Sequence, residues 1–528
     1  MKSPVLPDTP GAAPQTPRTT PVTRGLQAAA TGWATNHRWL FFGLIILGIL
    51  HLNYFIFEVL LTNHTLTNAR AKFYPTFKTD FEGRWAADLF MQLFGAGGNQ
   101  LMHGLLGLAM LALNGIILAE FLRVSCGWKR FLVASLVLTS PVFLDYFSYS
   151  VDAGYFGLGD TCVLLGVLIL DRSNQTLKKT CIAFALFVLA IAFYQPKASL
   201  ITTLLAFWIA LSCNRPDITV RELLIRSGYA IALFAISMVG YLLTYKLTAA
   251  PRTHQRTNVN TPAEALHEIA NSYGILTDLT WRFIGSFPDI VALPMGIGLI
   301  VGCVALLVAS FRNSIQAGIC CVLVLLTIPP CIQFSYVINS LTPLDQGRVL
   351  PGFAFSLAIF LGLAINANRW AGGLAGLATL IAFFSAGVQE GSLNSMKTLY
   401  ETQAINRITD RIESELSADK DHPLIIFGDL TFPQHSYITS PNRPLRPQAS
   451  NTAFPGYRHV FTINFFLGQN RIIKPTAEQV AIARQSVEER DPWPSEQSVF
   501  KLDDAIVVLL QPYSDDLSAT WSAGQIRE

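Results

Sequence analysis

Two acidic side chains, Asp80 and Glu82, stand directly before a stretch whose apolar residues recur with a helical spacing. Trp85, Leu89 and Leu93 belong to this stretch, and their spacing predicts an amphipathic helix that lies at a membrane surface. A carboxylate at that position could act as a general base toward a lipid-linked substrate. Asp80 or Glu82 could equally solvate the loop or cap the N-terminus of the helix.

A second cluster, Asp145, Tyr149 and Asp152, lies at the end of a long apolar run. Acidic residues near a membrane boundary are costly and tend to mark a functional site. The alternative is a carboxylate that hydrogen-bonds to neighbouring tyrosines at the water interface. Asp160 lies deeper in the following apolar run, where we expect it to be buried and paired, and the sequence indicates no role for it.

Two cations stand where apolar runs begin. Lys197 follows the turn 194–196, and Arg348 precedes another apolar run. A cation at a membrane boundary could bind a lipid phosphate, or it could only extend its apolar stem to bring the charge to water. Arg282, beside Trp281, is better explained as an anchor at the interface.

The composition shows which elements must position these residues. The chain has 528 residues, of which 51% are hydrophobic and 14% are charged, whereas soluble domains carry roughly 25% charged residues. This deficit excludes an ordinary soluble protein and a disordered one, and it predicts a polytopic α-helical membrane protein. The net charge is only +3 and no dense basic tract occurs, so nothing indicates a nucleic-acid partner.

Apolar runs predict about eleven transmembrane helices, several of them close to the lower length limit for a span. They are 39–61, 101–122, 131–148, 154–171, 178–194, 198–213, 228–246, 290–311, 315–335, 350–367 and 371–388. Lys and Arg concentrate in alternate short loops, where they include Arg123, Lys129, Arg215 and Arg312, whereas the turns on the other side hold Lys197 alone. The positive-inside rule therefore predicts a cytoplasmic N-terminus and, after eleven spans, an external C-terminus.

The predicted domains follow from this topology. Residues 1–37 are polar and rich in Pro and Thr, and are expected to form a disordered cytoplasmic tail. Residues 38–388 form the transmembrane domain, with outer loops over 62–100 and 247–289. Residues 389–528 can bury a small core outside the membrane. A helical pattern near 397–418 and strand patterns over 424–428 and 505–510 predict a small α/β domain there.

Several catalytic classes have no motif in the chain. None of the eight cysteines has metal-ligand spacing, so no metal site is predicted. Walker, G-x-S-x-G and H-E-x-x-H motifs are also missing, which argues against ATP hydrolysis in this chain. A reaction driven by a substrate that is already activated is compatible with what remains.

Three short motifs resemble the bacterial O-antigen glucosyltransferase II family. One segment of that family reads Ser-Pro-x-Phe-Leu…Ser-Tyr-x-x-Asp, and it is similar to Ser140-Pro141-Val142-Phe143-Leu144 with the following Ser148-Tyr149-Ser150-Val151-Asp152. The Tyr-Gln turn that follows this segment in the family is similar to Tyr194-Gln195-Pro196. The first outer loop of the family is similar to the loop that contains Gly83-Arg84. The hydropathy layout is similar over roughly residues 40–390. The chain departs from the family where Thr79 precedes Asp80 instead of an adjacent acid, and where Tyr146 replaces a common amide.

The resemblance implies a membrane glycosyltransferase of the GT-C type in the bacterial inner membrane, with the C-terminal domain in the periplasm. Such enzymes transfer a sugar, usually glucose, from a polyprenyl phosphate to a glycan acceptor such as lipid-linked O-antigen, and they need no cofactor. It implies Asp80 as general base, with Glu82 and Asp152 as alternates. The implied substrate-binding residues are Arg84, Lys197 and Arg348 for the phosphate, Tyr149, Tyr194 and Gln195 around the sugar, and Asp145.

A transporter or a lipid flippase is the alternative function. It would need polar residues deep in several spans to line a path. In this chain the charged residues concentrate at the outer ends of the spans, with Glu58 and Asp160 among the few exceptions. This distribution favours an active site at the membrane surface.

Overall fold

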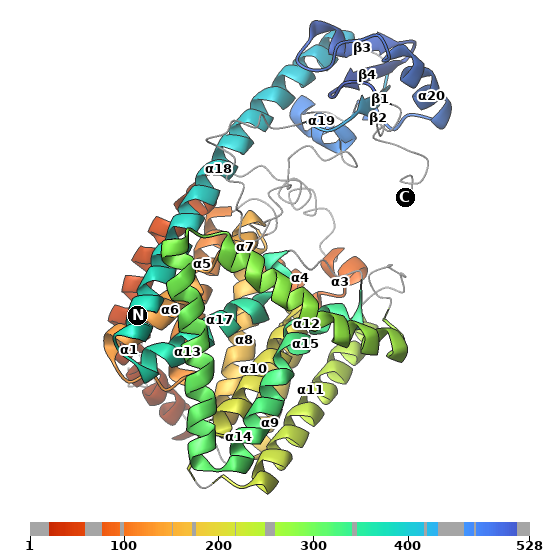
Figure 1. Cartoon of the computed structure of the whole chain (residues 1–528). Coiled ribbons are helices and arrows are strands. Elements are labelled where there is room, and N and C mark those ends of the chain that lie inside the picture. The colour runs from red at the N-terminus through yellow and green to blue at the C-terminus, as the bar shows by residue number, and fades with distance from the viewer. Residues whose placement is uncertain are drawn as a thin grey trace, which may run out of the picture.

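The computed structural model shows an α-helical bundle, with a small sheet-containing unit at the far end of one long helix (Figure 1). The residues that the structure describes are 21–58, 77–95, 100–149, 151–171, 176–216, 218–248, 259–340, 346–416, 420–430, 459–468 and 471–514.

Long apolar sequences form the helices of the bundle, because each helix satisfies its own backbone hydrogen bonds in an apolar environment. They are α1 (Pro21–Phe57), α5 (Gln100–Phe121), α6 (Gly127–Leu138), α7 (Leu144–Ser148), α8 (Ala153–Asp171), α9 (Leu177–Phe193), α10 (Lys197–Ser212), α11 (Val220–Thr248), α13 (Asp289–Asn313), α14 (Ile315–Leu326), α15 (Ile328–Ile332), α16 (Phe334–Ile338), α17 (Pro351–Ala367) and α18 (Ala371–Glu415). Two 3₁₀ turns accompany them, η1 (Pro141–Phe143) and η3 (Gly347–Val349). Every one of the predicted apolar segments overlaps at least one of these helices.

Six of the described helices are long and apolar enough to cross a membrane, or seven if the bent pair α6 and η1–α7 counts as one span. The six are α1 (from His37), α5, α8, α11, α13 and α18. The predicted count of eleven exceeds this number because some segments form shorter apolar helices, such as α10 and α17, and the segment 315–335 is broken into α14, α15 and α16. The protein is nevertheless a helical membrane protein.

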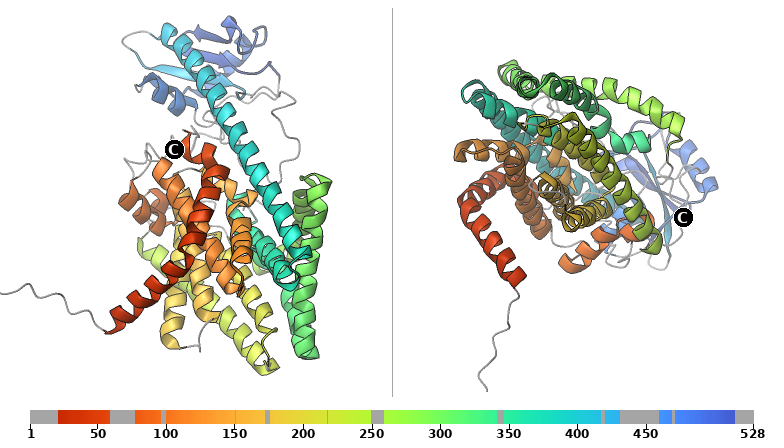
Figure 2. Two further views of the ribbon diagram at one scale, coloured as in Figure 1. Left: turned by 90° about the vertical axis from the view of Figure 1, so that its left-hand side faces the viewer. Right: turned by 90° about the horizontal axis from the view of Figure 1, so that it is seen from below.

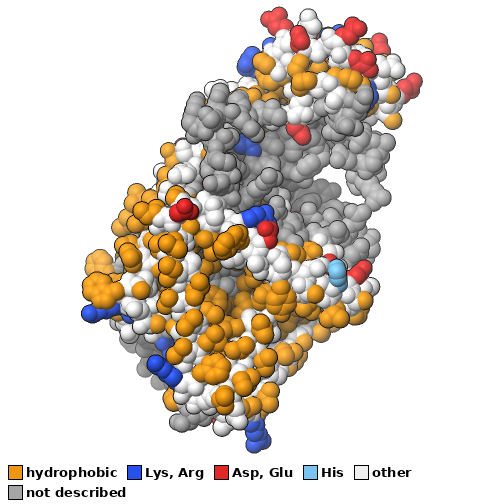
Figure 3. Space-filling view, in the orientation of Figure 1, with side chains coloured by type: hydrophobic (Ala, Val, Ile, Leu, Met, Phe, Trp, Pro, Cys, Tyr) orange, Lys and Arg blue, Asp and Glu red, His pale blue; other side chains and the backbone are white. Residues whose placement is uncertain are grey.

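Small residues let the helices pack closely. A side chain at Gly302 of α13 would collide with the backbone of Phe360 in α17, and one at Gly387 of α18 would collide with the ring of His51 in α1. Close backbone approach of this kind supplies the dispersion contacts that hold helices together in lipid. Hydrophobic side chains cover most of the bundle face in Figure 3, and several Lys and Arg side chains stand at its lower end.

Two helix boundaries differ from the prediction, the start of α1 and the end of α18. Helix α1 begins at Pro21, within the segment expected to be a disordered tail, while residues 1–20 lie outside the described part. The helical pattern near 397–418 and the last predicted span form one helix, α18, which continues through residue 389 (Figure 2). The change from apolar to charged residues at 389 therefore marks no break in the backbone.

Three further helices lie at the upper end of the bundle: α3 (Phe77–Glu82), α4 (Trp85–Phe94) and α12 (Pro262–Gly285). Thr261 and Glu264 form a capping box that begins α12, which contacts α15 and α16. The predicted outer loops thus contain helices, although residues 59–76, 96–99 and 249–258 lie outside the described part.

The last part of the chain forms a four-stranded sheet in the order β2-β1-β4-β3. Its elements are β1 (His422–Phe427), α19 (His459–Leu467), β2 (Ile472–Ile473), α20 (Ala477–Ser486), η5 (Glu496–Ser498), β3 (Val499–Leu502) and β4 (Ala505–Leu509). Strand β1 is parallel to β2 and β4, and β3 is antiparallel to β4. Because side chains alternate along a strand, Leu424 and Ile426 pack with Ile408 of α18, whereas Ile425 and Phe427 pack with the α20 side of the sheet.

Candidate functional site

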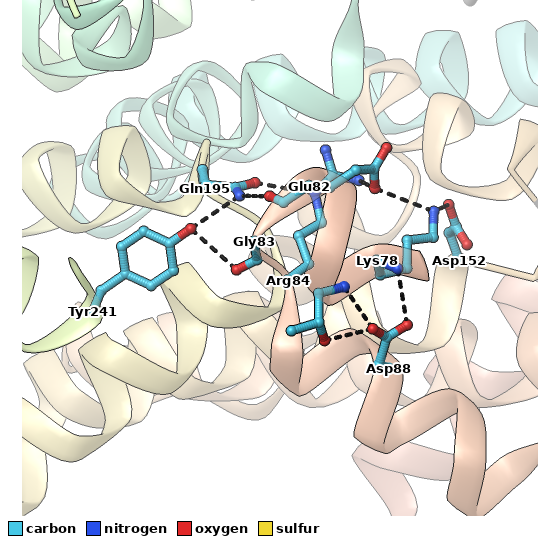
Figure 4. A network of polar contacts seen from close by, with 9 residues as sticks. Lys78, Glu82, Gly83, Arg84, Asp88, Asp152, Gln195 and Tyr241 are labelled. Carbon is cyan, nitrogen blue, oxygen red and sulfur yellow. Dashed lines mark hydrogen bonds and ion pairs between the residues drawn. The ribbon is translucent and has the colours of Figure 1, made fainter. Parts of the chain in front are cut away.

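Arg84 belongs to a polar network that also includes Glu82, Gln195 and Tyr241 (Figure 4). Its Nη1 donates to Glu82 Oε2 at 2.7 Å, and its Nε donates to Gln195 Oε1 at 3.0 Å. Its guanidinium carbon lies 4.5 Å from the ring centroid of Tyr194. The side chain is 13% exposed. Arg84 therefore links the α3–α4 connection to the short turn after α9, 111 residues later in the chain.

Electrostatics keep Arg84 charged despite its burial. Burial disfavours the charged guanidinium, but the neighbouring Glu82 carboxylate and further negative groups outweigh that effect and raise the pKa of Arg84 above its ordinary value. The site thus holds a permanent positive charge.

Gly83 allows the sharp turn that brings Glu82 and Arg84 together. Its φ angle is +70°, a conformation that favours glycine. A Cβ at this position would also lie 2.9 Å from the Tyr241 hydroxyl oxygen. That hydroxyl donates to the Gly83 carbonyl at 3.1 Å and accepts from Gln195 Nε2 at 3.0 Å, and Gln195 Nε2 also donates to the Glu82 carbonyl. Tyr241, on α11, is a member of the site that the sequence did not reveal.

Lys78 joins α3 to the beginning of α8. Its Nζ lies 3.4 Å from Asp152 Oδ2 and 3.5 Å from Glu82 Oε2, and the side chain is almost completely buried. Sequence reasoning missed Lys78, although its spacing of four residues before Glu82 is typical of an ion pair on a helix. The pairing brings Glu82 and Asp152, both predicted as candidate bases, into one network.

Asp88, on α4, holds the beginning of α3 in place. Its carboxylate accepts hydrogen bonds from the backbone N–H of Lys78 at 3.2 Å, and from the backbone N–H and hydroxyl of Thr79, each at 2.5 Å. Burial raises the pKa of Asp88, an effect that outweighs the hydrogen bonds from Thr79 and Lys78. This carboxylate was also missed, because its partners are backbone groups that a sequence does not reveal.

We expect Asp88→Asn to lower the free energy of unfolding by about 1–3 kcal/mol, because the amide replaces one acceptor oxygen with a donor that faces another donor. Thermal unfolding of the purified protein measures this change. Asp410→Asn, at an exposed position on α18, is the control and should leave the melting temperature unchanged. Equal melting temperatures for the two variants would contradict the role of Asp88.

A second cation, Arg348, contacts the cluster at the end of α7. Its backbone N–H donates to Asp145 Oδ2 at 3.0 Å, and its guanidinium carbon lies 4.0 Å from the ring centroid of Tyr149. Its Nη2 donates to Gln346 Oε1 at 2.7 Å. Tyr149 is close in turn to Asp152, whose backbone N–H donates to the Tyr149 carbonyl at 2.6 Å. The structure therefore brings together candidate residues from two distant parts of the sequence: Asp145 and Tyr149 from one part, and Arg348 from the other.

Lys197, expected as a partner of a lipid phosphate, is buried within the bundle. Its side chain is 0% exposed, and its Nζ donates to Asp160 Oδ1 at 2.5 Å and to the Tyr146 hydroxyl at 2.7 Å. The Tyr146 hydroxyl donates to Asp160 Oδ2 at 2.9 Å. The Lys197 ammonium therefore forms an ion pair with the buried Asp160 carboxylate of α8 inside the bundle. The expectation that Asp160 is buried and paired is confirmed.

The remaining candidates differ in how accessible they are. Asp80 is partly exposed at the end of α3, whereas Asp152 is 1% exposed. Tyr194 and Gln195, expected around a sugar, both contact Arg84. Among the described residues, no group of three or more His, Cys, Asp or Glu side chains is placed to hold a metal ion. Within the described part of the chain, the arrangement brings three buried or half-buried cations, Lys78, Arg84 and Arg348, close to the carboxylates of Glu82, Asp88, Asp145 and Asp152.

Comparison with known proteins identifies a related family. The family model described as Glucosyl transferase GtrII matches residues 59–361, which include all the site residues described above. No curated protein and no solved structure matches the chain.

Proposed function

Because the chain belongs to the GtrII glucosyl transferase family, we propose that it moves a glucosyl unit from a polyprenyl-phosphate donor to a hydroxyl group of a glycan such as lipid-linked O-antigen. Family membership agrees with the resemblance predicted from the short motifs. The observation that carries the proposal is the pairing of cations and carboxylates at one end of an apolar bundle, where a lipid-linked phosphate would meet water.

The proposed reaction needs charge stabilisation and a proton acceptor. The acceptor oxygen forms a bond to C1 of the sugar while the bond from C1 to the phosphate oxygen breaks, and the polyprenyl phosphate leaves with the electron pair. Preorganised cations stabilise the charge that develops on this leaving group. Arg84 suits this role, because its Nη2 has no hydrogen bond to a described residue while Nε and Nη1 are held in place. Arg348, fixed over Tyr149, would be the second phosphate partner.

Asp80 is the proposed general base, which takes the proton from the acceptor hydroxyl. It is partly exposed, and a base must be reachable by an acceptor that arrives from outside. Glu82 pairs with Arg84 and Lys78, and Asp152 is 1% exposed beside Lys78, so an acceptor would reach these alternates less easily than Asp80. In this proposal Tyr194 and Gln195 orient Arg84, and Asp145 orients the backbone at Arg348.

The proposed topology places this site on the periplasmic face of the bacterial inner membrane. Lys and Arg side chains stand at the lower end of the bundle (Figure 3), and the positive-inside rule would make that end cytoplasmic. The N-terminus would then be cytoplasmic, and α18 would carry the sheet into the periplasm, where it would form a small α/β domain. An odd number of crossings, such as the eleven predicted, fits this arrangement, and the fold would be of the GT-C type.

The transfer assay tests the proposal directly. Purified protein is incubated with radiolabelled undecaprenyl-phosphate-glucose and cell-envelope acceptors, and label is expected to move to the acceptor. A panel of other polyprenyl-phosphate sugars determines whether the donor sugar differs. If every donor is inert while the protein moves lipid or sugar across liposomes, the function is transport and the proposal is wrong.

We expect Arg84→Lys to lower the transfer rate by about 10- to 100-fold, although the charge is kept. Lysine cannot donate to Glu82 and Gln195 at once and stack on Tyr194, because only guanidinium offers donors in a planar fork. Initial rates with saturating donor measure the effect. Arg282→Lys is the control, because its side chain is 66% exposed and pairs only with Asp278 among the described residues. Wild-type rates for Arg84→Lys would show that the fork geometry is unimportant.

A further inference from the structure

Gln333 has a buried side-chain amide that forms no hydrogen bond within the described part of the chain. Its side chain is 2% exposed, and neither Oε1 nor Nε2 bonds to any of the described residues. Buried polar groups in native proteins are almost always hydrogen-bonded, and each exception calls for an explanation. The explanation is more pressing in a membrane protein, because no lipid group replaces the missing partner.

The backbone around Gln333 is irregular. Helix α14 ends at Leu326, and the two short helices α15 and α16 follow it with Gln333 between them. Pro329 and Pro330 lie in α15 and interrupt the regular hydrogen-bond pattern. Discontinuous helices at membrane depth are tolerated where they line a cavity, and transporters use them to form binding sites.

The position of Gln333 connects it to the candidate site. Two residues after it, the Ser335 backbone N–H donates to Ser199 Oγ at 2.9 Å, and Ser199 lies in the first turn of α10, directly after the turn that holds Gln195. The residue before Gln333 approaches α17, because a Cβ at Gly352 would lie 3.5 Å from the Cα of Ile332. Gly352 follows Arg348 by four residues. The backbone on either side of Gln333 thus contacts α10 and α17, the two helices that begin shortly after Gln195 and Arg348.

We propose that the Gln333 amide binds hydroxyl groups of the sugar that is transferred, an inference that rests on the proposed function. A primary amide presents an acceptor oxygen beside a two-hydrogen donor. This pair complements two adjacent hydroxyl groups of a hexose ring, one of which donates while the other accepts. Sites that hydrogen-bond a substrate hydroxyl discriminate strongly against analogues that lack it, because the buried group is then left unpaired. Gln333 would therefore help to determine which sugar the enzyme accepts.

Ligand-induced changes in melting temperature test the proposal without relying on activity. The probes are undecaprenyl phosphate and undecaprenyl-phosphate-glucose, and the variant is Gln333→Met, which keeps the length of the side chain. We expect both proteins to respond equally to undecaprenyl phosphate, which also shows that the variant is folded. Only the wild type should show the additional shift that glucose produces. Gln389→Met, exposed on α18 with its amide donating to Ser385, is the matched control and should behave as the wild type.

Transfer kinetics provide the second readout. We expect Gln333→Met to lower kcat/KM for the glucose donor by about tenfold or more, and to reduce the preference for glucose over its epimer galactose. Should the Met variant fail to respond to undecaprenyl phosphate, Gln333→Asn replaces it, since the shorter amide should also lose the glucose-dependent shift.

Two results would overturn the proposal: a glucose-dependent shift of the same size in wild type and variant, or no such shift in the wild type. A different result would refute the proposed function. A wild type that shows the shift but transfers no sugar would refute transfer, while loss of that shift in Gln333→Met would still support a sugar site at this amide.

Discussion

Replacing Asp80 with Asn is expected to lower the rate of sugar transfer by about 100- to 10,000-fold, because the amide cannot accept the proton of the acceptor hydroxyl and general-base catalysis is lost. The melting temperature should change little, since Asp80 is partly exposed and the substitution keeps its size. Initial rates with undecaprenyl-phosphate-glucose measure the loss. Asp410→Asn on α18, a surface substitution of the same type, should leave the rate unchanged.

Variants of Glu82 and Asp152, the two alternate bases, test whether Asp80 is the general base. Glu82→Gln and Asp152→Asn remove partners of Arg84 and Lys78, so we expect them to lower stability as well as the transfer rate. Full transfer by Asp80→Asn together with loss of transfer by Asp152→Asn would show that the assignment of Asp80 is wrong.

Lys197→Met is expected to lower the free energy of unfolding by about 3–5 kcal/mol, because it leaves the Asp160 carboxylate charged, buried and without its ion pair. The two side chains are each 0% exposed and their charged atoms lie 2.5 Å apart. Thermal unfolding of the purified protein measures the loss. Arg282→Met, which removes an exposed ion pair with Asp278, is the control and should cost at most about 1 kcal/mol.

The double variant Lys197→Met/Asp160→Asn separates the cost of an unpaired charge from the value of the pair itself. Replacing both members of a buried ion pair is often nearly neutral, so we expect the double variant to recover most of the stability that Lys197→Met loses. A double variant that unfolds as easily as the single one would show that the ammonium stabilises the fold through other contacts, such as the Tyr146 hydroxyl.

Hydropathy was sufficient to locate the apolar helices of the bundle, because the partition of a segment into lipid depends mainly on the composition of that segment. The predicted run 154–171 became α8 (Ala153–Asp171), and 198–213 became α10 (Lys197–Ser212). Strand patterns near 424–428 and 505–510 correspond to β1 and β4 for the same local reason. The continuity of α18 past residue 389 escaped prediction, since a helix does not have to end where its surroundings change from lipid to water.

By itself, the sequence determined the membrane class, the helical segments, the family and most of the charged residues that could act at the site. Only the tertiary structure decided which of those charges meet. Lys197 pairs with Asp160, 37 residues earlier in the chain, and Lys78 pairs with Asp152, 74 residues later. Only the folded chain also showed that the buried Gln333 amide has no hydrogen-bond partner among the described residues. Residue type and position describe what a side chain can do, but its partner depends on how distant helices pack, and that is a property of the whole fold.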